Sequence, residues 1–96
     1  MFILITYDVS TTEKAGRRRL RRVAQACKDY GVRAQKSVFE CQVGRTEWAI
    51  LRDRLLKEID LTQDSLRFYF LDEIAADKVE HHGITKPIDL EEPLVL

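Results

Sequence analysis

The chain opens with Phe2-Ile3-Leu4-Ile5-Thr6-Tyr7-Asp8, a stretch that is apolar almost throughout and ends in a carboxylate. Its β-branched and aromatic residues predict a central β-strand covered on both faces. After a short polar loop comes Arg17-Arg18-Arg19-Leu20-Arg21-Arg22, five arginines in six positions. The order of a strand, a loop and a basic helix sets the start of the fold and puts a carboxylate close to a concentrated positive charge.

The first helix is expected to begin after a cap at Thr11 or Thr12 and to run to Tyr30. Gly31 then suits a left-handed C-terminal cap. Apolar residues recur at the three-four spacing of one buried stripe. They are Leu20, Val23, Ala24, Cys27 and Tyr30.

Residues 32–43 are rich in β-forming types, but their alternation breaks at residues 36–38, which predicts two short strands with a turn or bulge between them. Thr46 is expected to cap a second helix. Its apolar stripe consists of Trp48, Leu51, Leu55 and Ile59, supported by Leu56. Residues 65–71 alternate as a further strand, with Leu66, Phe68 and Phe70 on one face and Tyr69 on the other.

This order predicts an α+β fold, the ferredoxin-like βαββαβ sandwich. We expect a single domain over residues 1–96, with a core of about residues 1–72 and a further segment over 73–96. Residues 78–82 and 88–90 are candidates for short extra strands. The apolar tail 93–96 needs a docking surface, and a second subunit would provide one.

The bulk composition is that of an ordinary globular domain, with 45% hydrophobic and 33% charged residues among 96. No apolar run is long enough to span a bilayer and no export signal is evident, so we expect a cytoplasmic protein with no membrane partner. Cys27 and Cys41 have no ligand partners at zinc spacing, and we expect both to be buried.

The net charge of zero hides a split between the two halves of the chain. Residues 1–45 carry ten Lys and Arg against four Asp and Glu, a net +6, and residues 46–96 carry six against twelve, a net −6. The split indicates a basic face that could bind a polyanion. Alternatively, the fold interleaves the two halves and the asymmetry disappears.

Asp8 is the candidate metal ligand, because carboxylate oxygen suits Mg²⁺ or Mn²⁺ and strand ends often carry chemistry. One carboxylate is not a complete site, but a two-fold dimer could bring two copies of Asp8 to one ion. The alternative is a structural role in which Asp8 caps the following turn through Ser10 or Thr11.

The helix arginines are candidate phosphate ligands, because Arg binds phosphate with two parallel hydrogen bonds. They are Arg17, Arg18, Arg19, Arg21 and Arg22, with Arg33 and Lys36 in the same half of the chain. The alternative is a plain solvated helix face.

Other candidates are weaker. Ser37 could donate to a phosphate or only form the turn. Tyr7 and Phe39 could stack on bases, although strand positions favour the core. His81 and His82 are adjacent, so in a strand they point to opposite faces and cannot both ligate one ion.

Three segments together resemble the CRISPR-associated protein two family. They are Ile5-Thr6-Tyr7-Asp8, Arg19-Leu20-Arg21-Arg22-Val23-Ala24 and Arg33-Ala34-Gln35-Lys36-Ser37-Val38-Phe39-Glu40-Cys41. The likeness covers nearly the whole chain. Its ending, Ile88-Asp89-Leu90-Glu91-Glu92-Pro93-Leu94, is similar to variants of type I-C systems.

The resemblance implies a ferredoxin-like homodimer in which the final strand of each subunit adds to its partner's sheet. It implies a metal-dependent endonuclease acting on single-stranded RNA or double-stranded DNA, with one Mg²⁺ or Mn²⁺ held between two copies of Asp8. Arg19 or its neighbours, Arg33, Ser37 and Phe39 fall where the family has residues important for activity.

The resemblance also implies a second role, in which the dimer bridges two copies of the CRISPR integrase during spacer acquisition. In that role the protein is a DNA-binding scaffold and the chemistry belongs to the partner. A third interpretation is a small regulatory binding module, which predicts ligand pockets and no steep salt dependence of nucleic-acid binding.

Overall fold

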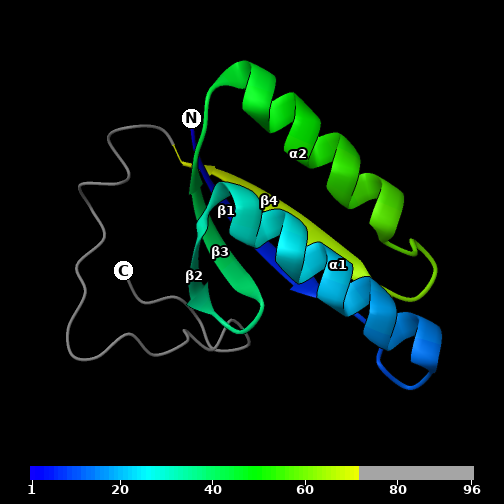
Figure 1. Cartoon of the computed structure of the whole chain (residues 1–96). Helices are drawn as coiled ribbons and strands as arrows, with labels where there is room; N and C mark the ends of the chain where they lie inside the picture. The colour runs from blue at the N-terminus through cyan, green and yellow to red at the C-terminus, as the bar shows by residue number, and fades with distance from the viewer. Residues whose placement is uncertain (72–96) are drawn as a thin grey trace.

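The computed structural model describes residues 1–71, which form four strands and two helices (Figure 1). They are β1 (Phe2–Asp8), α1 (Lys14–Tyr30), β2 (Val32–Gln35), β3 (Val38–Gln42), α2 (Arg45–Glu58) and β4 (Ser65–Leu71). This is the predicted order. The expected extra strands at 78–82 and 88–90, and the segment 73–96, lie outside the described residues.

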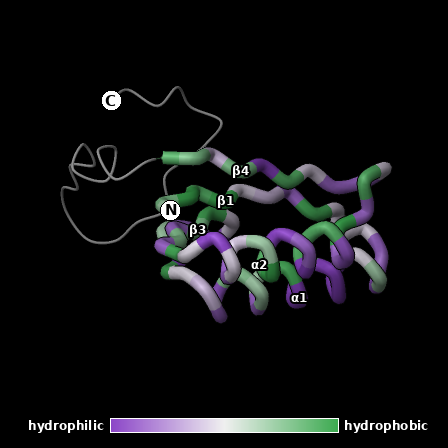
Figure 2. Tube along the Cα trace, turned by 90° about the horizontal axis from the view of Figure 1, so that it is seen from above, coloured by the Kyte–Doolittle hydropathy of each residue, from purple (hydrophilic) through white to green (hydrophobic). Residues whose placement is uncertain are grey.

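The strands form one antiparallel sheet in the order β2-β3-β1-β4, so β1 is a central strand as predicted. The predicted cover on both faces of β1 is not provided by residues 1–71, and Phe2 and Leu4 on the face away from the helices are half-buried. Both helices lie on the same side of the sheet (Figures 1 and 2). Two layers with this strand order are the ferredoxin-like arrangement, and the predicted fold class is confirmed. The C-terminal end of β1 therefore meets the start of α1, the β2–β3 turn and the start of β4.

The core lies between the sheet and the helices. Ile3 and Ile5 of β1 are fully buried and pair in register with Cys41 and Phe39 of β3. The alternate residues Phe2 and Leu4 lie on the opposite face and are half-buried. Each buried apolar side chain stabilises the fold by about 1.5–3 kcal/mol.

The two helical stripes pack on this core as predicted. In α1, Val23 and Cys27 are buried and Leu20, Ala24 and Tyr30 pack beside them. In α2, Trp48, Leu51 and Leu55 are buried, as is Ile59 directly after the helix, while Leu56 is more exposed than the pattern suggested. No helix of the described part is long and apolar enough to cross a membrane.

The predicted break in residues 32–43 is confirmed. β2 ends at Gln35 and β3 begins at Val38, and their pairing shifts register between Arg33 and Gln35. The turn is fastened to β1, because the Tyr7 amide donates to the Ser37 carbonyl at 3.1 Å.

The two predicted N-terminal caps are wrong, whereas Gly31 is the C-terminal cap of α1 as predicted but not in the predicted conformation. α1 begins at Lys14, and its cap position Glu13 makes no side-chain cap hydrogen bond, so neither Thr11 nor Thr12 caps it. α2 is capped at Gly44, whose amide donates to Glu47 Oε1 at 3.1 Å, and this places Thr46 inside the helix.

Gly31 is extended, with φ −151° and ψ −173°, and is not in the left-handed region. Its role is close approach: a Cβ at this position would lie 2.4 Å from Cys41 Sγ and 2.6 Å from the Glu40 carbonyl oxygen. The residue after α1 is a glycine because the chain passes directly over β3 there.

β4 lies at the edge of the sheet formed by the described strands, with the predicted alternation. Phe68 and Phe70 both contact the Trp48 ring edge-on, at centroid distances of 4.8 and 5.6 Å. Phe70 is nevertheless 60% exposed, because it lies at the margin of the helix layer. Tyr69 is on the other face, as predicted, and its hydroxyl accepts a hydrogen bond from Arg67.

Both cysteines are buried and free, as expected. Burial raises the pKa of Cys27 to about 12 and that of Cys41 to about 11. Thiols with such pKa values stay protonated near neutral pH, so they act as small core residues and not as nucleophiles.

Candidate nucleic-acid and metal site

Asp8 lies at the end of β1, paired in register with Ser65 of β4. Its carboxylate is exposed, and it has no hydrogen-bond or ion-pair partner among residues 1–71. The alternative role for Asp8, capping the turn after the strand, does not hold in this structure. The Ser10 amide donates instead to Asp64 Oδ1, at 3.0 Å.

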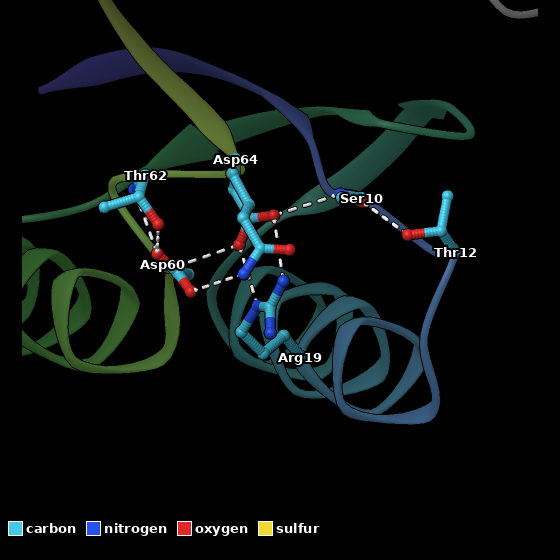
Figure 3. A network of polar contacts seen from close by, with 7 residues as sticks. Ser10, Thr12, Arg19, Asp60, Thr62 and Asp64 are labelled. Atoms are coloured by element: carbon cyan, nitrogen blue, oxygen red, sulfur yellow. Dashed lines mark hydrogen bonds and ion pairs between the residues drawn. The ribbon is translucent and has the colours of Figure 1, made fainter.

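Asp64 is the centre of a polar network between three segments (Figure 3). Its carboxylate accepts hydrogen bonds from the Ser10 amide, from the Asp60 amide at 2.9 Å, and from Arg19 Nε and Nη2 at 2.8 and 3.2 Å. The Asp64 side chain is 0% exposed and that of Arg19 is 18% exposed. Burial alone would raise the pKa of Asp64, but the Arg19 guanidinium and the two amides outweigh it, and the pKa is lowered.

Asp60 closes the turn that carries Asp64. Its Oδ1 accepts hydrogen bonds from the Thr62 amide at 2.9 Å and from the Thr62 hydroxyl at 2.6 Å (Figure 3). This turn, in which an aspartate binds the backbone two residues later, is a common local motif. It lowers the pKa of Asp60 and fixes the approach to β4.

Arg33, Phe39 and Tyr7 form a stack on the helix side of the sheet, the face opposite to that of Asp8. The Arg33 guanidinium carbon lies 5.1 Å from the centroid of the Phe39 ring, and the Tyr7 and Phe39 rings are 6.2 Å apart and nearly parallel. Phe39 is 0% exposed, so it supports Arg33 from within the core and does not face solvent. Arg33 itself is exposed.

The Tyr7 hydroxyl donates to the Lys36 carbonyl at 3.2 Å. Burial raises the pKa of Tyr7, so its phenol stays protonated and acts as a donor. With the Tyr7 amide on Ser37, this bond holds the turn at 36–37 against the end of β1. The exposed side chain of Lys36 and the half-buried hydroxyl of Ser37 therefore lie at the same end of the sheet as Asp8.

The helix arginines divide into two groups. Arg17 donates to the Thr11 carbonyl at 3.3 Å, Arg19 binds Asp64, and Arg22 lies 3.6 Å from Glu58. Arg18 and Arg21 are exposed and have no partner within residues 1–71. The two halves of the chain are thus partly interleaved, since Asp64 and Glu58 come from the acidic half.

An open hollow of about 490 Å³ lies along the N-terminal half of α1. It is lined by Thr11, Lys14, Arg17, Leu20 and Arg21. Residues 1–71 carry 14 Lys and Arg against 9 Asp and Glu, a net charge of +5. A basic hollow on a positively charged domain suits a polyanion.

Residues 1–71 of one chain do not provide a complete metal cage. No group of three or more His, Cys, Asp or Glu side chains lies together in residues 1–71. A single unpaired carboxylate still fits Mg²⁺, which is commonly bound through one or two carboxylates, several waters and substrate phosphate. Asp8 therefore fits as one ligand of a site that a second carboxylate or a phosphate would complete.

The structure brings Asp8, Lys36 and Ser37 to one end of the sheet, where the basic side of α1 also begins. Arg33 and Phe39 are paired with each other further along the sheet, level with Ile5 in the middle of β1. The structure separates Arg19 from the exposed arginines by pairing it with Asp64. Asp64 itself was missed by sequence reasoning. The Asp60–Thr62 spacing was a readable turn signal, but nothing in the sequence connects Asp64 to Ser10, 54 positions earlier.

Comparison with known proteins places the chain in a family. Residues 1–79 match the sequence model described as CRISPR associated protein Cas2. The CRISPR-associated endoribonuclease Cas2 of Chlorobaculum tepidum is 54% identical over 96 residues, which are 100% of both chains. The CRISPR-associated endonuclease Cas2 of Halalkalibacterium halodurans is 50% identical over 95 residues, 99% of each chain.

Solved structures agree with the fold. The crystal structure of Streptococcus pyogenes Cas2 at pH 6.5 is 49% identical, with a TM-score of 0.75 over 86% of this chain and 100% of that chain. A second Cas2 crystal structure, 23% identical, has a TM-score of 0.67 over 99% of this chain and 98% of its own. Their sheet and helices match an arrangement that the sequence alone predicted here. The chain belongs to the CRISPR-associated protein Cas2 family.

Proposed function

We propose that this protein is a metal-dependent endonuclease that cleaves phosphodiester bonds in single-stranded RNA or double-stranded DNA and works, as a homodimer, in the acquisition of CRISPR spacers. The observation that carries the proposal is the exposed carboxylate of Asp8 at the end of the central strand, which has no partner within residues 1–71, a part of the chain with a net charge of +5. The names of the relatives, endoribonuclease and endonuclease, support the reaction class.

Asp8 is the residue that would hold Mg²⁺ or Mn²⁺, together with Asp8 of a second copy across a two-fold axis. When bound, such an ion polarises the scissile phosphate and lowers the pKa of a bound water. The carboxylate suits this task because no described side chain occupies its oxygens. Ser37 is a candidate hydroxyl donor to the phosphate.

The cations of the site would hold the nucleic-acid backbone without reading its sequence. Arg18, Arg21 and Lys14 on the exposed side of α1 have no competing partner within residues 1–71. Arg33 stays exposed while Phe39 supports it, so its guanidinium is held in a restricted position over the Phe39 ring. Preorganised cations of this kind bind phosphate at a lower entropic cost than free side chains do.

A second candidate function is a DNA-binding scaffold that bridges two copies of the CRISPR integrase. The observation that favours it is the scarcity of candidate catalytic groups in the described part of the chain. Asp8 has no neighbouring carboxylate or histidine that would complete a metal cluster within residues 1–71. In this function the cations of α1 would hold a duplex while the partner enzyme cuts and joins.

The deciding experiment compares wild type with Asp8→Asn on labelled single-stranded RNA and duplex DNA, with Mg²⁺, Mn²⁺ or EDTA. Asp53→Asn is the matched control, because Asp53 is an exposed aspartate paired only with Lys57 on the outside of α2. Cleavage that requires metal, survives in Asp53→Asn and disappears in Asp8→Asn with binding retained supports the nuclease. Binding without cleavage in wild type favours the scaffold.

A further inference from the structure

The segment between Asp8 and α1 has no regular secondary structure, but the Asp64 carboxylate binds its Ser10 amide. The same carboxylate accepts hydrogen bonds from Arg19 Nε and Nη2 of α1 and from the Asp60 amide of the α2–β4 connection (Figure 3). The side chain is 0% exposed, and no buried side-chain polar atom in the described part lacks a partner. A fully satisfied buried network of this kind fixes the relative position of the segments that enter it.

Asp64 is connected to Asp8 from two directions. Asp64 directly precedes Ser65, which pairs in register with Asp8 across the sheet. The Ser10 amide, bound to Asp64, comes two residues after Asp8. The backbone of Asp8 is therefore restrained on one side by its pairing with Ser65 and on the other by the loop that contains Ser10. Asp64 is adjacent to Ser65 in the chain and binds the Ser10 amide.

The start of α1 packs closely against the loop that contains Ser10. Gly16 packs so closely on Ser10 that a Cβ at Gly16 would lie 1.9 Å from the Ser10 carbonyl oxygen. This approach brings Arg19 to the carboxylate with two parallel hydrogen bonds. Two of the three guanidinium nitrogens of Arg19 are thus occupied by Asp64.

We infer that Asp64, acting through Ser10 and with Arg19 as its counter-ion, is a positioning residue for Asp8. This inference rests on the proposed nuclease function. It separates the arginines of α1 by role: Arg19 holds Asp64, whereas Arg18 and Arg21 are available for phosphate. Asp64 and Arg19 can affect catalysis without touching the reacting atoms. Displacing a reacting group by about 1 Å can lower the rate about 100-fold.

The test uses full-length Asp64→Asn, with Asp53→Asn as the control for loss of one aspartate charge on the surface. The asparagine side chain has the same shape as aspartate but cannot accept hydrogen bonds at both positions. We measure hydrogen exchange of the Ser10 amide, the folded fraction, and kcat and KM for the cleaved nucleic acid with Mn²⁺. In Asp64→Asn we expect faster exchange at Ser10 and a fall in kcat of at least about 10-fold per folded molecule, with KM within about two-fold because the exposed cations of α1 remain.

A purely structural role would lower activity only in proportion to the folded fraction, and that result overturns the inference. An unchanged kcat alongside faster exchange at Ser10 overturns it as well. If Asp64→Asn does not fold, Arg19→Lys replaces it, since it keeps the charge and loses the two-point hydrogen bonding. The same readouts then decide.

Failure of the proposed function is a different result. A wild-type protein that cleaves neither RNA nor DNA overturns the nuclease. In that case the test is the paramagnetic broadening of the Asp8 amide resonance in NMR spectra when Mn²⁺ is added without nucleic acid. Weaker broadening in Asp64→Asn than in wild type and Asp53→Asn supports the positioning role, and equal behaviour in all three proteins overturns it.

Discussion

Asp8 and Asp64 lie at the same end of the sheet and have opposite surroundings. Asp8 ends β1 with an exposed carboxylate and no partner in the described part of the chain. Asp64 comes just before β4, is 0% exposed and accepts four hydrogen bonds. A buried carboxylate is tolerated only when it is paired, whereas a ligand-binding carboxylate must keep its oxygens available. The comparison shows how one fold uses the same side chain for structure and for a candidate site.

The largest effect on activity is expected from substituting Asp8, the aspartate proposed to bind a ligand and not to support the fold. We expect Asp8→Asn to reduce cleavage by more than the roughly 10–100-fold that loss of an outer-shell partner of a metal site costs. The melting temperature should stay close to that of wild type, because exposed substitutions usually change stability by less than about 0.5 kcal/mol. Cleavage assays and thermal unfolding on the same samples check both parts. A large loss of stability would mean that Asp8, like Asp64, is structural.

Asp64→Asn, unlike Asp8→Asn, should lower the stability of the fold substantially. An asparagine leaves at least one donor of the buried network unsatisfied, which we expect to lower the free energy of unfolding by about 3 kcal/mol. For a domain of this size that corresponds to a fall of more than about 10 °C in melting temperature. Urea unfolding measures the difference. A change as small as that of Asp53→Asn would show that the network contributes little.

The stability difference between wild type and Asp64→Asn should depend on pH. The pKa of Asp64 is lowered in the folded protein, since the upward effect of burial is outweighed by hydrogen bonds from Arg19 and two amides. Its stabilising contribution is therefore complete above the ordinary aspartate pKa of about 3.9 and is lost as the pH falls through the lower folded value. The stability gap between wild type and Asp64→Asn should stay constant from about pH 7 to about pH 5 and narrow below about pH 4. A gap that widens in acid would contradict the direction of the shift.

The contrast between the two aspartates also explains what the sequence could predict. The strands, the helices and their stripes depend on local periodicity, so residues such as Ile3, Ile5, Val23 and Leu51 could be assigned to the core from the sequence. Asp8 could be identified because its chemistry and its place at a strand end are both local properties.

Asp64 could not be identified, because its partners Ser10 and Arg19 are 54 and 45 positions away in the chain. Residues 60–65 are mostly polar in sequence and resemble any surface loop until the fold brings Arg19 of α1 to Asp64. The incorrect caps have the same origin. Gly31 is extended because β3 passes within contact distance, a tertiary restraint that local cap rules do not contain.

The arginines of α1 divide in the same way between structural support and ligand binding. Substituting one of the binding arginines should have the smallest of the expected effects, a few-fold change in affinity. Arg21→Gln should remove one phosphate contact, weaken duplex binding a few-fold at physiological salt and reduce the slope of log K against log salt by about 0.9. Arg19→Gln should leave that slope unchanged and lower stability, since its guanidinium faces Asp64. Fluorescence anisotropy over a series of salt concentrations, performed at low temperature so that both variants are folded, measures the two slopes. Equal reductions would show that Arg19 leaves Asp64 when nucleic acid binds, and the division of the α1 arginines into supporting and binding groups would then fail.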